Sequence, residues 1–270
     1  MATASVHSQA SYAQRIAFVA EMAARLHRYG TTAQRLEAAI TALSQRLDLE
    51  CEAWSNPTGL ILSFSDPRKP LGSTDTTRVI RLPPGENDLH KLCEADRIAE
   101  AVATGQMSVA QGHTALRTLD RPASPRARVM RVLTFGLAAA AVAGLWRLPW
   151  LDIATAGVAG LAIGLLDLYA SPRPAWREAS EALAGLLAGF LATLVAVWIS
   201  PLNLNTVVIA SLVVLLPGMA ITNAMNELSS QHWVSGTARF AGALTTVMKL
   251  TVGSIIAIQV LEKLGVHPQV

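Results

Sequence analysis

The spacing of hydrophobic residues changes near position 130. Before it, apolar positions recur at helical or strand spacing among many polar residues; beyond it they form long, nearly unbroken stretches. Helical spacing predicts four helices, at 12–29, 32–47, 87–104 and 108–119. Short apolar runs bounded by turn residues predict three strands, at 49–54, 60–64 and 77–82. This order, ααβββαα, predicts an α+β domain over residues 1–120.

Five apolar stretches follow, at 132–149, 151–168, 182–199, 205–222 and 237–260. A helix that crosses the hydrocarbon core of a bilayer needs about 20 such residues. The first two stretches are nearly contiguous, but one helix of their joint length would measure roughly 55 Å, so we divide them at Leu148 and Pro149. The pattern predicts a membrane protein with an all-α bundle of five transmembrane helices over residues 132–270. A basic linker, 121–131, joins it to the first domain.

The charged residues are also distributed unevenly between the two parts of the chain. Residues 1–131 hold 16 Lys and Arg and 13 Asp and Glu, whereas residues 132–270 hold 6 and 6. A charge at mid-bilayer costs about 3 kcal/mol, so charge depletion is expected of a transmembrane domain.

The positions of the arginines predict the orientation in the membrane. They concentrate in loops that would share one side: Arg126, Arg128 and Arg131 before the first stretch, Arg173 and Arg177 between the second and third, and Arg239 before the fifth. Since basic residues mark cytoplasmic loops, we expect a cytoplasmic N-terminal domain and an external C-terminus (N-in/C-out). We expect no cleavable signal peptide, because charges interrupt the first apolar run.

Several classes of function have no motif here. The net charge of +3 comes from interleaved acids and bases, so we expect no nucleic-acid partner. No glycine-rich phosphate loop or Gly-x-Ser-x-Gly element occurs, so we expect neither ATP-driven transport nor an enzyme. Six scattered histidines and two cysteines, Cys51 and Cys93, have no ligand spacing, so no metal or cofactor is expected.

The segment around Pro217 and Gly218 predicts a break in the fourth apolar helix. Proline removes a helical hydrogen bond and glycine adds backbone freedom. Unwound backbone at membrane depth is tolerated where it is buried in protein or lines a cavity, and transporters place substrates at such breaks. Thr222, Asn223 and Glu227 would then supply polar contacts. A simple kink with a polar end is the alternative.

Charged residues near the apolar stretches are further candidates. Lys249 lies near the middle of the fifth stretch, where it could bind a carboxylate or titrate. Asp167, at the end of the second stretch, could be the partner of Lys249. Asp167 or Glu227 could carry a proton. Arg239 precedes the fifth stretch. The simpler interpretation of Lys249 is snorkelling or a structural pair. The simpler interpretation of Asp167 is an interfacial carboxylate without function.

Two polar clusters stand out in the N-terminal domain. The first comprises Gly30, Thr32, Arg35 and Glu37, and the second comprises Pro57, Thr58 and Gly59. Arg35 and Glu37 are two positions apart on a helix, so they do not face each other and each needs another partner. Solvated charge and a plain turn are the simpler interpretations. The alternative is a loop that meets a ligand or the membrane domain.

Glycines at four-residue spacing, Gly160 with Gly164 and Gly185 with Gly189, allow helices to approach closely. This pattern predicts tight packing within one bundle or, alternatively, an oligomer contact.

The segments "YGTTAQRLEAAITAL", "NPTGLILSF" and "LPGMAITNAMNELSSQHWVSGTAR" together resemble the threonine/serine exporter family. The resemblance extends over nearly the whole chain. One departure is conservative: the family usually has Gly-Ala and Arg-Val-Glu where this chain has Gly30-Thr31 and Arg35-Leu36-Glu37.

This resemblance implies export of small hydrophilic metabolites driven by the proton motive force. Long family members export threonine and serine and contain two membrane halves. This chain resembles the short, YjjP-like members, which work with a separate YjjB-like membrane partner in succinate export. The resemblance therefore implies one subunit of an exporter of threonine, serine or a dicarboxylate in a bacterial inner membrane, with a homo-oligomer left open. The alternative is a membrane-anchored hydrolase or a regulatory subunit that acts through the N-terminal domain.

Overall fold

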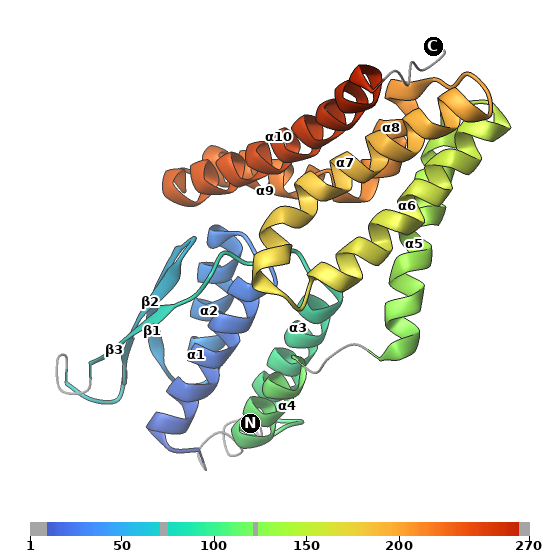
Figure 1. Cartoon of the computed structure of the whole chain (residues 1–270). Helices are drawn as coiled ribbons and strands as arrows, with labels where there is room; N and C mark the ends of the chain where they lie inside the picture. The colour runs from blue at the N-terminus through green and yellow to red at the C-terminus, as the bar shows by residue number, and fades with distance from the viewer. Residues whose placement is uncertain (1–9, 71–74, 121–123, 265–270) are drawn as a thin grey trace. The chain divides into compact units, whose positions relative to one another are not determined.

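The computed structural model describes residues 10–70, 75–120 and 124–264 (Figure 1). These residues form two compact units. The first unit contains the described residues up to 120 together with Met219–Ala241, and the second contains residues 124–218 and those from 242 onward.

The N-terminal part of the first unit contains the seven predicted elements in the predicted order. They are α1 (Tyr12–Arg28), α2 (Ala33–Arg46), β1 (Glu50–Asn56), β2 (Gly59–Ser65), β3 (Thr76–Arg81), α3 (Leu89–Ala103) and α4 (Val109–Thr118). Capping boxes at Ser11 and Ser108 begin α1 and α4, because each serine accepts a bond from the backbone N–H three residues on.

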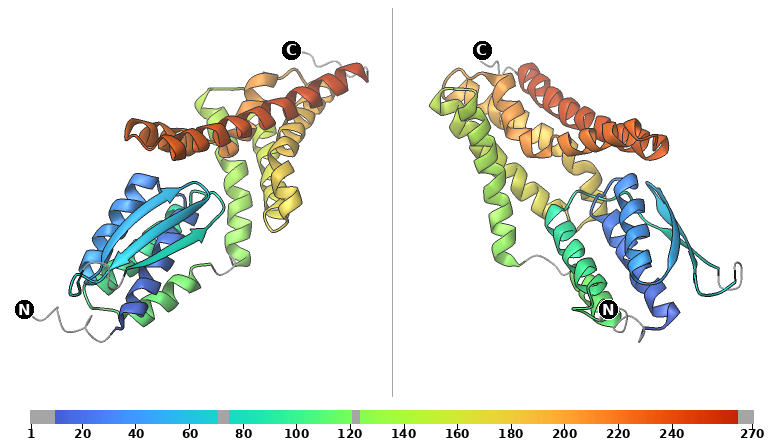
Figure 2. Two further views of the ribbon diagram at one scale, coloured as in Figure 1. Left: turned by 90° about the vertical axis from the view of Figure 1, so that its left-hand side faces the viewer. Right: turned by 180° about the vertical axis from the view of Figure 1, so that it is seen from behind.

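The three strands form one antiparallel sheet in the order β1-β2-β3. Alternate residues of β2, Leu60, Leu62 and Phe64, are fully buried, since side chains alternate between the two faces of a strand. Figure 2 shows α1 and α2 on one side of this sheet. Buried residues of both helices, among them Phe18 and Leu36, belong to the same hydrophobic core.

The first unit also contains most of α9 (Gly218–Ser229) and the start of α10 (Trp233–Lys263). A tight corner joins the two helices. Gln231 has a positive φ of 65°, and a Cβ on Gly236 would lie 2.7 Å from Leu228 Cγ. The corner therefore depends on a glycine at position 236.

The second unit is helical. It contains α5 (Pro125–Leu145), α6 (Trp150–Ala170), α7 (Pro174–Trp198), α8 (Leu204–Leu212), a 3₁₀ turn η3 (Val213–Leu215) and the remainder of α10. In the described part of the chain, four helices are long and apolar enough to cross a membrane: α5, α6, α7 and α10. The number rises to five if the bent pair formed by residues 204–215 and α9 is one span.

The ends of several elements differ from the predictions. α5 begins at Pro125, inside the segment predicted as the linker 121–131, of which residues 121–123 lie outside the described part. Ser124 caps this helix, and proline fits its first turn, where a helix needs no N–H. α7 and α10 also extend beyond the predicted 182–199 and 237–260, since polar turns continue the helices past their apolar stretches.

The fourth apolar stretch, predicted at 205–222, is interrupted at Pro217, as the proline and glycine predicted. The segments on either side of the break form an angle of 63°. The backbone N–H of Gly218 donates to the carbonyl of Leu216 over 2.8 Å, a tight turn in place of a helical bond. The predicted break is confirmed.

The paired glycines pack helices within the second unit. A Cβ on Gly160 of α6 would lie 2.7 Å from the Phe135 carbonyl oxygen of α5. A Cβ on Gly189 of α7 would lie 2.7 Å from the Ser254 carbonyl oxygen of α10. These contacts support tight packing within one bundle.

Candidate functional site

Polar residues from two distant parts of the sequence meet around Glu227 in the first unit. The Glu227 side chain is fully buried. Its Oε1 accepts a 3.0 Å bond from the backbone N–H of Ala33, and its Oε2 lies 3.0 Å from Arg239 Nε. Arg239 Nη2 lies 3.3 Å from Oε1, so the guanidinium spans both carboxylate oxygens. One buried carboxylate therefore joins α9, α10 and the start of α2.

Glu227 provides the hydrogen-bond acceptor at the start of α2 that the side chain of Thr32 does not provide. Thr32 is the N-cap residue of α2, but its side chain makes no capping bond. The first N–H groups of a helix need an outside acceptor, and Ala33 is the first residue of α2. The negative charge of Glu227 also suits the positive end of the helix dipole.

A second bridge joins Glu37 of α2 to His232 at the α9–α10 corner. Glu37 Oε1 accepts a 2.7 Å bond from the backbone N–H of Ser55, and Glu37 Oε2 lies 3.2 Å from His232 Nε2. The other ring nitrogen of His232 lies 3.0 Å from the carbonyl of Ser230. Both ring nitrogens face acceptors, so both can donate together only when the imidazole is protonated.

Gly30 allows a third contact. Its φ is +81°, and a Cβ here would lie 2.6 Å from Asn87 Oδ1. That oxygen accepts a 3.4 Å bond from Asn223 Nδ2 of α9. Glycine at position 30 thus leaves room for the amide that reaches Asn223.

His27, in the last turn of α1, lies beside this cluster. Burial lowers the pKa of the His27 imidazole below its ordinary value, and hydrogen bonds to the backbone of Pro83 and Pro57 oppose this effect. The nearby charges of Arg239 and Arg28 lower the pKa further. A neutral His27 adds no positive charge next to Arg239.

The structure brings together four of the sequence candidates: Thr32, Glu37, Glu227 and Arg239. Two more candidates lie beside this group and both contact Asn87: Gly30 packs against it, and Asn223 donates a hydrogen bond to it. Arg35 and Thr58 are exposed outside this group. A Cβ on Gly59 would lie 2.7 Å from the Ile80 carbonyl oxygen, so Gly59 serves strand pairing. Thr222 is exposed on α9.

The remaining candidates lie in the second unit with partners of their own. Lys249 Nζ lies 3.1 Å from Glu181 Oε2, and Arg131 Nε lies 3.0 Å from Asp167 Oδ2. The predicted pairing of Lys249 with Asp167 is therefore wrong. Lys249 faces α7 from α10, whereas Asp167 lies at the end of α6 beside α5.

Sequence reasoning missed His232, Ser55, Asn87 and Glu181. His232 stands inside a segment that was already singled out, but nothing in its spacing names a glutamate 195 positions away. Glu181 lay just outside the apolar stretch assigned to its helix, and a polar residue so placed is ordinarily solvated.

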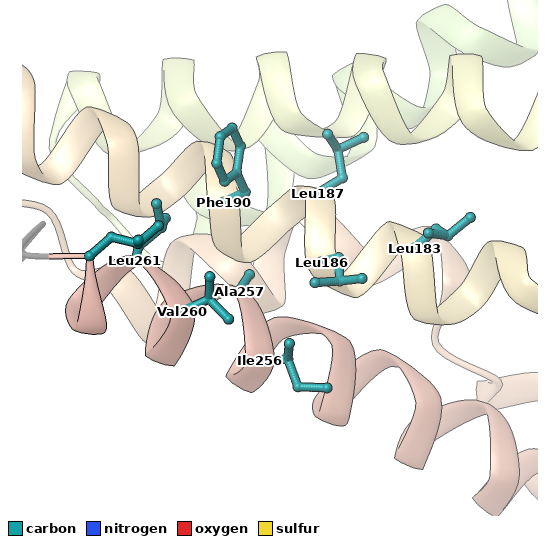
Figure 3. Close-up of a pocket in the computed structure, with 9 residues that line it drawn as sticks. Leu183, Leu186, Leu187, Phe190, Ile256, Ala257, Val260 and Leu261 are labelled. Carbon is teal, nitrogen blue, oxygen red and sulfur yellow. The ribbon is translucent and has the colours of Figure 1, made fainter.

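The second unit also has an apolar groove of about 380 Å³ between α7 and α10. Figure 3 shows side chains that line it, such as Leu183, Phe190 and Val260. The lining side chains are all apolar. Sites for small hydrophilic molecules need placed polar groups, so this groove is unsuited to such a molecule.

Comparison with known proteins gives a consistent result. The model of the ThrE family, described as threonine/serine exporters, matches residues 17–261. The chain is 27% identical over 239 residues to the "Pheromone-regulated membrane protein 10" of Pichia sorbitophila, covering 86% of this chain and 23% of that protein. It is 26% identical over 204 residues to the "Probable threonine/serine exporter" of Mycobacterium tuberculosis, covering 73% of this chain and 38% of that protein.

The chain thus spans about a quarter of the length of the first of these relatives. No solved structure matches. The family and the mycobacterial relative carry the name of an exporter, not of an enzyme.

Proposed function

Since the chain is a multi-pass membrane protein that belongs to the threonine/serine exporter family, we propose that it is one part of a secondary exporter of small hydrophilic metabolites. The substrates are threonine, serine or a dicarboxylate such as succinate. They leave a bacterial cell across the inner membrane, and the proton motive force drives their export.

The break at Pro217 is the observation that carries this proposal beyond the family name. The apolar helix is interrupted here and bent by 63°. Interrupted backbone at membrane depth is tolerated where it is buried in protein or lines a water-filled cavity. Substrates of transporters are commonly bound at such interruptions. Pro217 and Gly218 form the interruption, and Thr222 and Asn223 on α9 supply polar side chains close in sequence.

The Lys249 region is the second part of the proposed pathway. Lys249 is paired with Glu181, and Thr246 donates a 2.9 Å bond to the same carboxylate. A lysine held by a carboxylate can exchange that partner for the carboxylate of a substrate. Asp167, paired with Arg131, remains a proton-carrier candidate in this scheme.

The N-terminal domain has a mechanical role in the proposal. Glu227, Arg239 and Glu37 attach α9 to α2, and α9 continues directly from the broken segment. The domain therefore holds the polypeptide immediately beyond the break. Motion of the helix at Pro217 would have to work against these bonds.

The resemblance to the short, YjjP-like members of the family also favours a second protein. We propose a separate, YjjB-like membrane protein as the second half, with homo-oligomers of the chain as a further possibility. If residues 204–229 form one span, the described residues contain five spans. A second half that follows an odd number of spans would run inverted, as in many secondary transporters. Purified chain that transports its substrate alone in liposomes would contradict the need for a partner.

The proposed orientation predicts where Cys93 can be labelled. The chain has two cysteines: Cys93 is exposed on α3, whereas Cys51 is buried and burial raises the pKa of its thiol. Thiolates are the reactive form, so a maleimide should modify Cys93 and spare Cys51. A membrane-impermeant maleimide should label inside-out vesicles and leave intact cells unlabelled, with Cys93→Ser as the control. Labelling of intact cells would place the N-terminal domain outside.

Lys249→Met should abolish export while the protein still inserts into the membrane. The substitution removes the cation that holds Glu181 and the proposed binding point for a substrate carboxylate. Export is measured from preloaded cells that lack their own exporters. Lys263→Met, at an exposed position in the last turn of α10, is the matched control and should leave export unchanged. Undiminished export by Lys249→Met would remove this residue from the pathway.

A further inference from the structure

The start of α6 contains a buried carboxylate. Asp152 is only 1% exposed and lies in the first turn of the helix. One of its oxygens, Oδ2, accepts a 3.2 Å bond from the backbone N–H of Asn203 and a 2.8 Å bond from the side-chain amide of the same residue. Asn203 precedes α8, so this contact joins α6 to the loop between α7 and α8.

Asp152 differs from the other acidic residues of the apolar half. Asp167, Glu181 and Glu227 each pair with a basic side chain. Glu178 and Glu262 are exposed. Among residues 124–264, Asp152 is the carboxylate that is buried and has no basic partner.

The surroundings of Asp152 are unusual for a carboxylate at membrane depth. Ionisable residues inside transmembrane segments are rare, and they pair with other charges or mark ion and proton pathways. Asp152 has no basic partner and is held by the backbone N–H and the side-chain amide of Asn203. A buried carboxylate held by neutral donors is therefore a candidate for carrying a proton.

The helices packed around α6 add little charge at this end. They are α5, α7 and α8. Arg147 follows α5 with an exposed side chain. The charges of α7 lie within its first eight residues, at the other end of the bundle, and α8 has no ionisable residue. Thr193, five residues before the end of α7, has a fully buried hydroxyl without a hydrogen-bond partner. In the described structure, this end of the bundle therefore buries a carboxylate without a basic partner and a hydroxyl without a hydrogen-bond partner.

We propose that Asp152 is the site at which the exporter binds the proton that drives transport. This inference rests on the proposed function, which makes the chain part of a proton-driven exporter. In the proposed orientation the start of α6 faces the outside, from which the proton motive force drives protons inward. Asp152 takes up a proton there and is neutral while the bundle rearranges. The proton is then released toward the cytoplasm.

Infrared spectroscopy tests proton binding without any transport. The full chain is reconstituted in lipid bilayers, and the C=O stretching band of buried, protonated carboxylic acids is recorded as the pH is varied. The wild-type protein should show a band that titrates and that Asp152→Asn lacks. Glu262→Gln, at an exposed position, should keep it. An unchanged band in Asp152→Asn, or no titrating band in the wild type, would overturn the proposal.

Transport assays distinguish a role of Asp152 in proton coupling from a purely structural role. Asparagine keeps an oxygen that can accept the bonds from Asn203. In cells with the partner half, Asp152→Asn should lose efflux driven by a pH gradient but keep exchange of substrate across the membrane at the wild-type rate. Loss of both activities, or retention of gradient-driven efflux, would contradict a coupling role. Absence of efflux from the wild type as well would instead contradict the proposed function, and the infrared result would still decide proton binding.

Discussion

Replacing Glu227 with alanine should lower the free energy of unfolding of the protein by about 3–5 kcal/mol, the usual effect of removing one partner of a buried ion pair. The substitution leaves the Arg239 guanidinium without its carboxylate and the Ala33 N–H without its acceptor. It should also detach α9 and the start of α10 from the N-terminal domain. Protease digestion of the protein in nanodiscs should therefore begin in residues 219–241.

The comparison variant is Asn226→Ala, on the same turn of α9 with an exposed side chain. It should change the unfolding free energy by less than about 0.5 kcal/mol and leave the digestion pattern as in the wild type. Glu227→Gln should fall between the two, because the amide keeps one acceptor oxygen for Ala33 but no charge for Arg239. If Glu227→Ala and Asn226→Ala unfold alike, the bridge does not hold the first unit together.

Gly253→Ala should destabilise the contact of α7 with α10 by about 1–3 kcal/mol, and Gly253→Val by more. A Cβ at Gly253 would overlap the carbonyl oxygen of Ala182, and a Cβ at Gly185 would overlap the carbonyl oxygen of Leu250. Backbone atoms cannot turn aside as a flexible side chain can, so the helices must separate. The thermal unfolding midpoint of the protein in nanodiscs, followed by tryptophan fluorescence, measures the effect.

Gly242 provides the matched control on the same helix. A Cβ at Gly242 would meet no atom within 4 Å. Gly242→Ala should therefore leave stability unchanged or raise it by up to about 1 kcal/mol through the better helix propensity of alanine. Equal unfolding midpoints for Gly242→Ala and Gly253→Ala would show that close approach of α7 and α10 is not required.

Much of the fold could be predicted because local patterns determine it. The short apolar run at 60–64 after a turn signal predicts a strand, and the structure contains β2 at Gly59–Ser65. The break at Pro217 could be predicted because it follows from the missing N–H of a proline. Helix ends were less accurate, as at Pro125, because the apolar stretch of a membrane helix is shorter than the helix itself.

The site could be predicted only in part. Glu37, Glu227 and Arg239 were each identified as charged residues that need partners, but the sequence does not say which charges pair. Arg239 lies 12 residues from Glu227, and Ala33 lies 194 residues from it. The same difficulty led to the wrong pairing of Asp167 with Lys249. Asp152 was missed because an acidic residue in the first turn of a helix ordinarily marks no more than a favourable helix end.

Efflux from preloaded cells tests the central claim most directly. Cells that lack their own exporters would produce this chain, its partner half, or both, and threonine, serine and succinate would be measured outside, with and without a protonophore. We predict efflux of at least one of these metabolites, blocked by the protonophore, when both proteins are present. No efflux in any strain, with both proteins shown to be in the membrane, would contradict the proposal that the chain is part of a proton-driven exporter.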